Sequence, residues 1–168
     1  MGEIYSPILS KRFVNDNFAY FYNQVNFFVG DTFFVISYNE PHSILCSLNS
    51  SCGALFAEII GRKSMGEGVL LMYGSEISNL LVLHPNLIRV DKILLQSMLN
   101  RNFFPIFKEL GFDPTRPICE QEPNPLPDRK ALDDIVFDAL GLTEEERKEV
   151  YWAVAELVNN RLEKAKSV

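Results

Sequence analysis

Residues 124–168, NPLPDRKALDDIVFDALGLTEEERKEVYWAVAELVNNRLEKAKSV, predict two consecutive helices with few alternatives. Asp128 is a good helix N-cap, and the apolar residues behind it recur at three- and four-residue steps. Gly141 follows the last of these residues, where a glycine in the left-handed conformation commonly ends a helix. Thr143 and Glu146 then form a capping box, so we expect a second helix to begin at once.

The second helix has glutamates at its positive N-terminal end and basic residues at its negative C-terminal end, which suits the helix dipole. Its expected apolar stripe consists of Val150, Val154, Leu157, Val158 and Leu162. Two amphipathic helices joined by a two-residue loop predict an antiparallel hairpin. The apolar faces of such a hairpin need something further to cover, so its simplest interpretation is a docking tail.

This tail resembles the C-terminal end of adenine-specific DNA methyltransferases from bacterial and archaeal restriction-modification systems. Upstream, a series of segments looks like the target-recognition domain of those enzymes, similar to the TaqI-like specificity domain and to type I specificity subunits. These segments are 48–51 (LNSS), 56–58 (FAE), 61–68 (GRKSMGEG), 76–77 (EI) and 80–85 (LLVLHP). The resemblance covers residues 10–168. It implies double-stranded DNA as a partner, together with an upstream methyltransferase domain or subunit.

The chain divides into three regions by composition. Residues 1–112 alternate strand-like and helix-like patterns and predict an α/β (α+β) domain with a mixed sheet, which the resemblance identifies as the target-recognition domain. Residues 113–128 hold five prolines and predict an extended linker that sets the distance to the C-terminal part. Residues 129–168 form the helical hairpin.

Within the first region, 18–29 and 32–38 predict two neighbouring strands, and 69–73 and 80–83 predict further strands. Residues 41–60 have helical spacing and predict one core helix that ends at Gly61. A second helix is expected over 92–110, with a kink or restart at Pro105 and a stop at Gly111.

Composition is that of an ordinary globular protein, with 47% hydrophobic and 23% charged residues among 168. No apolar run approaches the ~20 residues of a membrane helix, and no signal sequence is recognisable, so we expect a cytoplasmic protein without a membrane partner. Three cysteines without a CxxC pair argue against a disulfide framework or a zinc site and favour buried, reduced thiols.

The net charge of −6 argues against extensive DNA contact by this chain alone, because duplex binding normally needs a basic surface. The acidity is unevenly distributed, however. Residues 1–112 hold 8 Lys and Arg against 9 Asp and Glu, whereas residues 113–168 hold 8 against 13. The front region is therefore nearly neutral and can bind DNA if its cations cluster.

The best candidates for DNA contact are Arg62, Lys63 and Ser64, which follow Gly61 in a glycine-rich segment that we expect to be a flexible loop. Arginine can donate two parallel hydrogen bonds to guanine, while lysine and serine reach phosphates. An equally supported alternative is that Arg62 caps the carbonyls of the helix ending at Gly61. Lys11 and Arg12 are a second cationic pair, or else a solvated edge.

Aromatic residues crowd the first predicted strand. In such a β-rich stretch they are more often core than base-stacking residues. They are Phe18, Tyr20, Phe21, Tyr22, Phe27 and Phe28.

Catalytic motifs of the family are missing from this sequence. Adenine methyl transfer in that family requires an NPPY-like or DPPY-like tetrapeptide and a glycine-rich cofactor loop. The nearest match, 124–127 (NPLP), lacks the second consecutive proline and the aromatic residue, and we interpret it as a spacer. The resemblance thus implies that S-adenosylmethionine binds the parent catalytic domain, and that this chain is an excised fragment or a split subunit that recognises without catalysing.

Other chemistry finds little support. His42 and His84 stand beside prolines and are interpreted as turn residues, not metal ligands. In 61–68 Arg62 separates Gly61 from Lys63, unlike a phosphate-binding P-loop. Two alternatives remain: a protein-interaction module that docks its acidic tail on a partner subunit, and a free-standing enzyme of unknown chemistry. Clustering of the four cations on one face would favour DNA recognition.

Overall fold

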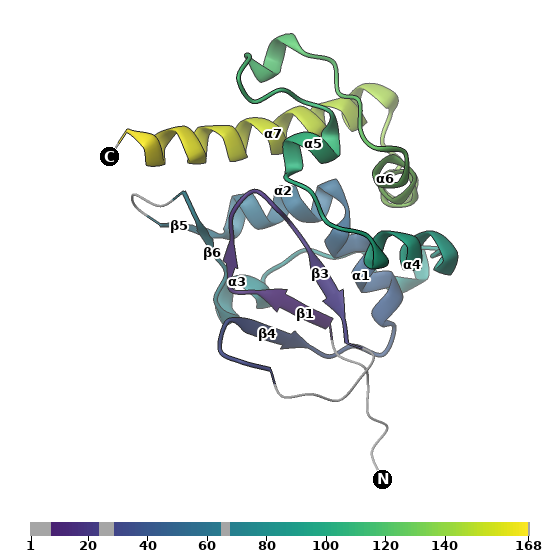
Figure 1. The fold of residues 1–168 in the computed structure, drawn as a ribbon. Helices are drawn as coiled ribbons and strands as arrows, with labels where there is room; N and C mark the ends of the chain where they lie inside the picture. Colours follow the sequence, from purple (N-terminus) through teal and green to yellow (C-terminus); the bar gives the residue numbers. More distant parts are fainter. Residues whose placement is uncertain (1–7, 24–28, 65–67, 168) are drawn as a thin grey trace.

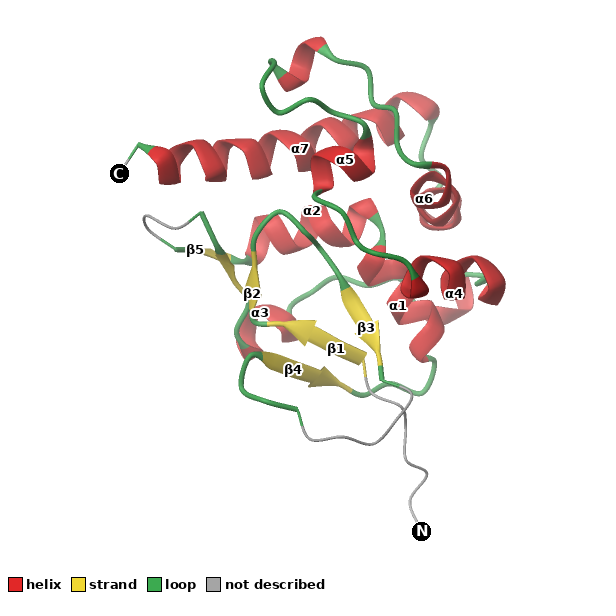
Figure 2. Cartoon of the chain, viewed as in Figure 1, coloured by secondary structure: helices red, strands yellow, loops and turns green. Residues whose placement is uncertain are grey.

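The structure, a computed structural model, describes residues 8–23, 29–64 and 68–167. Over these residues the chain has an α+β fold, as predicted, in which two small sheets lie beside a group of helices (Figures 1 and 2). Both described sheets are antiparallel, in place of the single mixed sheet that was expected. The strands are β1 (Ile8–Lys11), β2 (Phe13–Val14), β3 (Tyr20–Tyr22), β4 (Phe33–Ile36), β5 (Arg62–Lys63) and β6 (Leu70–Leu71). The helices are α1 (Pro41–Asn49), α2 (Ser51–Ile60), α3 (Gly74–Ser78), α4 (Lys92–Asn100), α5 (Ile106–Leu110), α6 (Pro127–Leu140) and α7 (Glu144–Lys166), with 3₁₀ turns η1 (Pro85–Leu87) and η2 (Ile118–Glu120).

The first sheet has the order β3-β1-β4. Both predicted strands exist, but the expectation that they are neighbours was wrong. The central strand β1 lies between them, with Leu9 opposite Phe21 on one side and Val35 on the other. β1 has only four residues, which is too short for a hydrophobic alternation to predict a strand. It is recognised in the structure by its pairing with β3 and β4.

The second sheet has the order β2-β6-β5. The strand predicted over 69–73 is present as β6, whereas residues 80–83 form no strand. The backbone N–H of Leu83 instead donates to the Ser47 hydroxyl, 3.1 Å away, which ties this segment to α1. Arg12 joins the two sheets, because its N–H donates to the Thr32 carbonyl and its own carbonyl accepts from the N–H of Met72, both at 2.9 Å.

The helix predicted over residues 41–60 is in fact two helices, α1 and α2, bent by 73°. Ser50 separates them, with an extended backbone and a side-chain oxygen that accepts from the N–H of Gly53. The hydrophobic spacing continues across this break, which is why the sequence pattern did not reveal it. None of the described helices is by itself long and apolar enough to cross a membrane; α1 and α2 meet that criterion only as a bent pair.

The helix expected over 92–110 restarts after Pro105, giving α4 and α5. Gly111 ends α5 in the left-handed conformation, φ 77°, as predicted. A side chain at Gly111 would collide with the Asn124 carbonyl group, because an added Cβ would lie 2.1 Å from its oxygen.

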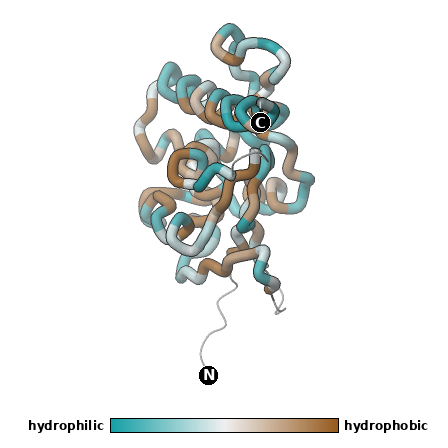
Figure 3. The backbone as a smooth tube through the Cα atoms, turned by 90° about the vertical axis from the view of Figure 1, so that its left-hand side faces the viewer, coloured by the Kyte–Doolittle hydropathy of each residue, from teal (hydrophilic) through white to brown (hydrophobic). Residues whose placement is uncertain are grey.

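Both C-terminal helices form as predicted, but they do not pack side by side as an antiparallel hairpin: α6 is seen end-on in Figure 1, whereas α7 runs across the view and packs on α2, α5 and η2. Gly141 ends α6 with φ 70°, and Thr143 and Glu146 make the reciprocal capping box of α7. The prediction that Asp128 is the N-cap was wrong, because α6 starts at Pro127, two residues earlier than predicted, and Asp128 pairs instead with Arg101. Figure 3 shows hydrophilic and hydrophobic residues interspersed along α7.

The buried face of α7 packs on α2 and on the loop around η2, so this helix covers the chain's own core. Leu157, expected in the stripe, is only half-buried. The buried residues of α7 are Tyr151, Val154, Ala155, Val158 and Arg161. A hydrophobic core cluster runs from Ile8 to Val158 and includes residues of the front region, of α6 and of α7.

The proline-rich segment is not an extended spacer. Its backbone donates hydrogen bonds from Asn124 to Leu110 and from Leu126 to Glu109, each 2.9 Å. The indole N–H of Trp152 donates to the carbonyl of Gln121 at 2.6 Å. The segment therefore packs against α5 and α7. Its prolines have no N–H group to donate, and some of its remaining backbone carbonyls and N–H groups form hydrogen bonds with these helices.

Buried ionic groups also connect α6 to the front region, residues 1–112. Glu109 in α5 accepts hydrogen bonds from Arg101 at 2.6 Å and from Arg129 at 3.1 Å. In α6, the fully buried Asp133 accepts from the backbone N–H and the hydroxyl of Ser51, at 2.6 and 2.7 Å. These contacts fix α6 against α2 and α5.

Candidate functional site

The five predicted contact residues lie on or beside the two sheets. Arg62 and Lys63 form β5, and Ser64 follows them, its N–H bonded to the Val69 carbonyl in a hairpin with β6. Lys11 ends β1, and Arg12 stands between β1 and β2. The segment after Gly61 is thus an edge strand, and the expectation of a flexible loop was wrong over 61–64; residues 65–67 lie outside the described part.

Arg12 and Arg62 converge on one aromatic ring. The guanidinium carbon of Arg12 lies 4.8 Å from the centroid of the Tyr73 ring, and that of Arg62 lies 5.3 Å from it. Phe13 is 48% exposed and its ring centroid is 5.5 Å from the Arg12 guanidinium. We call Arg12, Phe13, Arg62 and Tyr73 the Tyr73 patch. Both cations gain from the electron-rich face of Tyr73.

The register of the second sheet explains the position of Arg62 within the patch. Phe13 and Arg62 both lie opposite Leu71, in β2 and β5 respectively, so the three side chains share one face of the sheet. Lys63 lies opposite the fully buried Leu70 and therefore belongs to the other face. The sequence places Arg62 and Lys63 side by side, but the pleat separates them.

The Arg62 side chain is held by α3. Its Nε donates to the Glu76 carboxylate at 2.8 Å, and its Nη2 donates to the Ser75 hydroxyl at 3.3 Å. Desolvation raises the pKa of Glu76, but the hydrogen bonds from Arg62, Ser75 and the backbone outweigh it, and the pKa is lowered. The alternative role of Arg62 as a helix cap was wrong, since its side chain donates to Glu76 and Ser75 of α3 and not to the carbonyls at the end of α2.

Arg12 has no carboxylate partner among the described residues. Its Nε is sealed from solvent and has no hydrogen-bond partner there. Within the described part of the chain, this guanidinium contacts the rings of Phe13 and Tyr73.

Lys11 belongs to a different environment. Its ammonium group lies 5.6 Å from the centroid of the Phe21 ring on the first sheet. Burial lowers the pKa of Lys11 from its usual value. The structure thus brings Arg12 and Arg62 together and leaves Lys11 and Lys63 outside their cluster, so only two of the four cations meet the clustering expected for DNA recognition.

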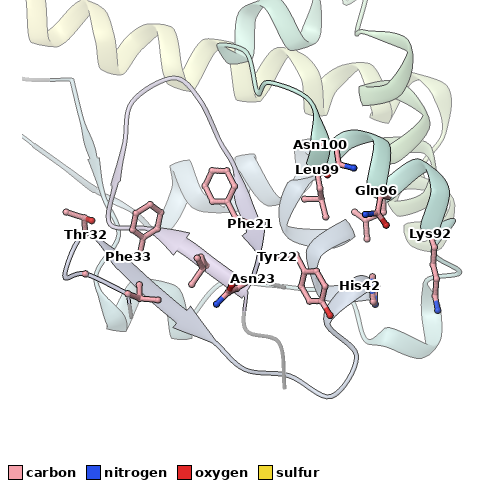
Figure 4. Close-up of a pocket in the computed structure, with 14 residues that line it drawn as sticks. Phe21, Tyr22, Asn23, Thr32, Phe33, His42, Lys92, Gln96, Leu99 and Asn100 are labelled. Carbon is pink, nitrogen blue, oxygen red and sulfur yellow. The ribbon is translucent and has the colours of Figure 1, made fainter. Parts of the chain in front are cut away.

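A cavity of 810 Å³ lies between the first sheet and α4 and was not indicated by the sequence. Figure 4 shows Phe21 and Phe33 on its strand side and Gln96, Leu99 and Asn100 on its α4 side. Its lining is mostly apolar and comes from β1, β3, β4, α1, α4 and the loop before β4. Because these segments are far apart in the sequence, no local motif predicts the cavity. Of the aromatic run, Phe18 and Tyr20 are buried as expected, Phe21 and Tyr22 are half-buried, and Phe27 and Phe28 lie outside the described residues.

Other reactive side chains are engaged in the fold. No three His, Cys, Asp or Glu residues within the described ranges could hold a metal ion together. His84 accepts a hydrogen bond from the N–H of Asn86 in a turn, and His42 lies beside the Tyr22 ring. Cys46 and Cys52 are buried, and burial, aided by Asp133, raises the pKa of each thiol to about 12. Cys119 is exposed, contrary to expectation.

Comparisons with protein-family models, curated proteins and solved structures found no match to this chain.

Proposed function

We propose that this chain is a recognition module for double-stranded DNA, which positions a separate S-adenosylmethionine-dependent domain of an adenine-specific restriction-modification methyltransferase. The observation that supports it best is the convergence of Arg12 and Arg62 on Tyr73 beside the exposed ring of Phe13. Arginine combined with aromatic residues suits both phosphate and base edges. The proposal places the protein in the prokaryotic cytoplasm, where its DNA would be.

Charge distribution is compatible with this role despite the net charge of −6. The excess of carboxylates lies in residues 113–168, and several of them are paired within the helical part, as in Arg147 with Asp134 and Asp138. The Tyr73 patch holds two guanidinium groups against one neighbouring carboxylate, Glu76. A weak basic surface of this size fits a module that shares phosphate contacts with an attached domain.

The alternative is a protein-interaction module that docks its acidic tail on a partner subunit. The apolar face of α7 is already covered by the chain's own core, so a partner would have to bind its outer, charged face. For that reason we favour DNA recognition.

The test is a selection of bound duplexes from a random pool at low salt, followed by a salt titration of the selected duplex. We expect a recurrent sequence, and a double variant Arg12→Ala/Arg62→Ala with weaker binding and a shallower slope of log affinity against log salt. Arg116→Ala is the matched control, because Arg116 is exposed in the loop between α5 and η2, away from the second sheet (Figure 1). A pool that stays random, with affinity unchanged by the double variant, would contradict the proposal.

A further inference from the structure

The two arginines of the Tyr73 patch differ in which nitrogen atoms remain free. Arg62 uses Nε for Glu76 and Nη2 for Ser75. Arg12 makes no hydrogen bond through its side chain to any described residue, and Nε alone among its three nitrogens is both sealed from solvent and unpartnered. Its two terminal nitrogens therefore remain open to a ligand.

This geometry restricts how Arg12 can bind. An arginine can offer an oxyanion either the Nε and Nη2 pair from the side or the two terminal nitrogens from the end. Burial of Nε against Phe13 and Tyr73 removes the side-on pair. The end-on pair remains, and it matches the O6 and N7 acceptors on the major-groove edge of guanine.

The position of Arg12 is also fixed before any ligand arrives. Its backbone is bonded to Thr32 on one side and to Met72 on the other, so it is held by both sheets. Its guanidinium carbon lies 5.5 Å from the centroid of the Phe13 ring and 4.8 Å from that of the Tyr73 ring. Holding a side chain in its bound geometry lowers the entropy cost of binding, and a rigid scaffold positions recognition residues accurately.

We propose that Arg12, and not Arg62, recognises the major-groove edge of a guanine in the DNA site, end-on through its two terminal nitrogens. This inference rests on the proposed DNA-binding function and names the base that the Tyr73 patch recognises. Arg62 is then a positioning residue, which holds its side of Tyr73 and neutralises Glu76.

The experiment uses the whole chain and the duplex selected above. Each guanine of that duplex is replaced singly by 7-deazaguanine, which lacks N7, and by inosine, which keeps both O6 and N7. We expect one 7-deazaguanine position to weaken wild-type binding by roughly five- to 150-fold, while inosine there has little effect. The same replacement is expected to have no further effect on Arg12→Ala.

Variants separate recognition from charge. Arg12→Lys keeps the charge but loses the two-pronged geometry, so we expect it to lose discrimination at that guanine while its salt slope stays close to that of wild type. Arg62→Ala is expected to weaken all duplexes about equally, because it leaves the Glu76 carboxylate unpaired beside the DNA. Thermal denaturation checks that each variant is folded.

Three outcomes overturn the inference. A selected site without guanine excludes it, as does Arg12→Lys binding and discriminating like wild type. If Arg12→Ala weakens selected and scrambled duplexes equally, Arg12 contacts phosphate, and the inference fails while the proposed function stands. If no duplex is bound and no sequence is selected, the proposed function itself fails.

Discussion

Arg161, near the end of the chain, donates through Nη2 to the Glu58 carboxylate in α2 at 2.6 Å, and the two side chains are 2% and 0% exposed. The same guanidinium donates to the carbonyls of Asn15 and Gly68. One residue of α7 therefore connects α2, the turn before β3 and the end of the β5–β6 hairpin. The C-terminal helix is part of the structure that holds the Tyr73 patch.

We expect Arg161→Met to lower the free energy of unfolding by about 3 to 5 kcal/mol, because it leaves Glu58 charged and unpaired in the core. The double variant Arg161→Met/Glu58→Leu should recover part of this loss, since no buried charge remains alone. Urea denaturation measures both. Lys166→Ala, which breaks the exposed pair with Glu163, is the control and should leave the midpoint unchanged; an Arg161→Met variant as stable as this control would contradict the prediction.

A second prediction compares a buried leucine of α6 with a half-buried leucine of α7. Leu132 in α6 is 0% exposed, and Leu132→Ala should cost about 2 to 5 kcal/mol. Leu157→Ala should cost clearly less, because Leu157 is half-buried and lies outside the core cluster. Denaturation midpoints of the two variants compare the same deletion at two sites. Equal losses would mean that the Leu157 face of α7 is covered after all.

Asp133 should make stability depend on pH. Burial raises its pKa from the usual 3.8 to about 6, against the opposing effects of Arg129 and of hydrogen bonds from Ser51 and Tyr151. Between these two pH values the folded protein holds a proton that the unfolded chain has released. This contribution to the free energy of unfolding therefore falls as pH rises from about 4 to about 6, by on the order of 2 to 3 kcal/mol, and is constant above.

The Asp133→Asn variant isolates that contribution, because other carboxyl groups titrate in the same range. Urea denaturation of both proteins at several pH values gives the difference in stability. We expect wild type to lose stability relative to Asp133→Asn between pH 4 and 6. A difference that does not change with pH would show that the folded-state pKa of Asp133 is not raised.

Two glycines test whether the proline-rich segment is docked. Gly111 and Gly141 both have positive φ, 77° and 70°, so alanine is strained at each, by roughly 1 to 2 kcal/mol. Only Gly111 also faces the Asn124 carbonyl group, whereas nothing lies within 4 Å of a Cβ at Gly141. Gly111→Ala should therefore destabilise more than Gly141→Ala in thermal denaturation. Equal shifts would indicate that residues 113–126 move away without cost.

The chain by itself is expected not to bind S-adenosylmethionine and not to methylate DNA. The reason lies in the sequence, where residues 124–127 (NPLP) lack the second proline and the aromatic residue of the NPPY-like tetrapeptide of adenine methyltransferases, and no glycine-rich cofactor loop is recognisable. Isothermal titration calorimetry with S-adenosylmethionine, and transfer of a labelled methyl group to duplex DNA, measure the two expectations. Either binding or transfer by the purified chain would refute this assignment of roles.

The sequence by itself determined the local features. Gly111 and Gly141 end their helices, and Thr143 with Glu146 begins α7, because each of these signals involves residues within a few positions of one another. The α+β class followed equally from short-range periodicity. The DNA-contact candidates were chosen by residue type alone, which named Arg12 and Arg62 but also Lys11 and Lys63.

Only the tertiary structure decided how these parts combine. Strand β1 pairs with both β3 and β4, and Arg12 follows it at the junction of the two sheets. The pairing of β5 with β6 places Arg62 beside the Tyr73 ring, which Arg12 also contacts. The buried pair of Arg161 with Glu58 joins residues 103 positions apart. Such contacts depend on strand register and on packing between distant segments, which no local pattern of residues encodes.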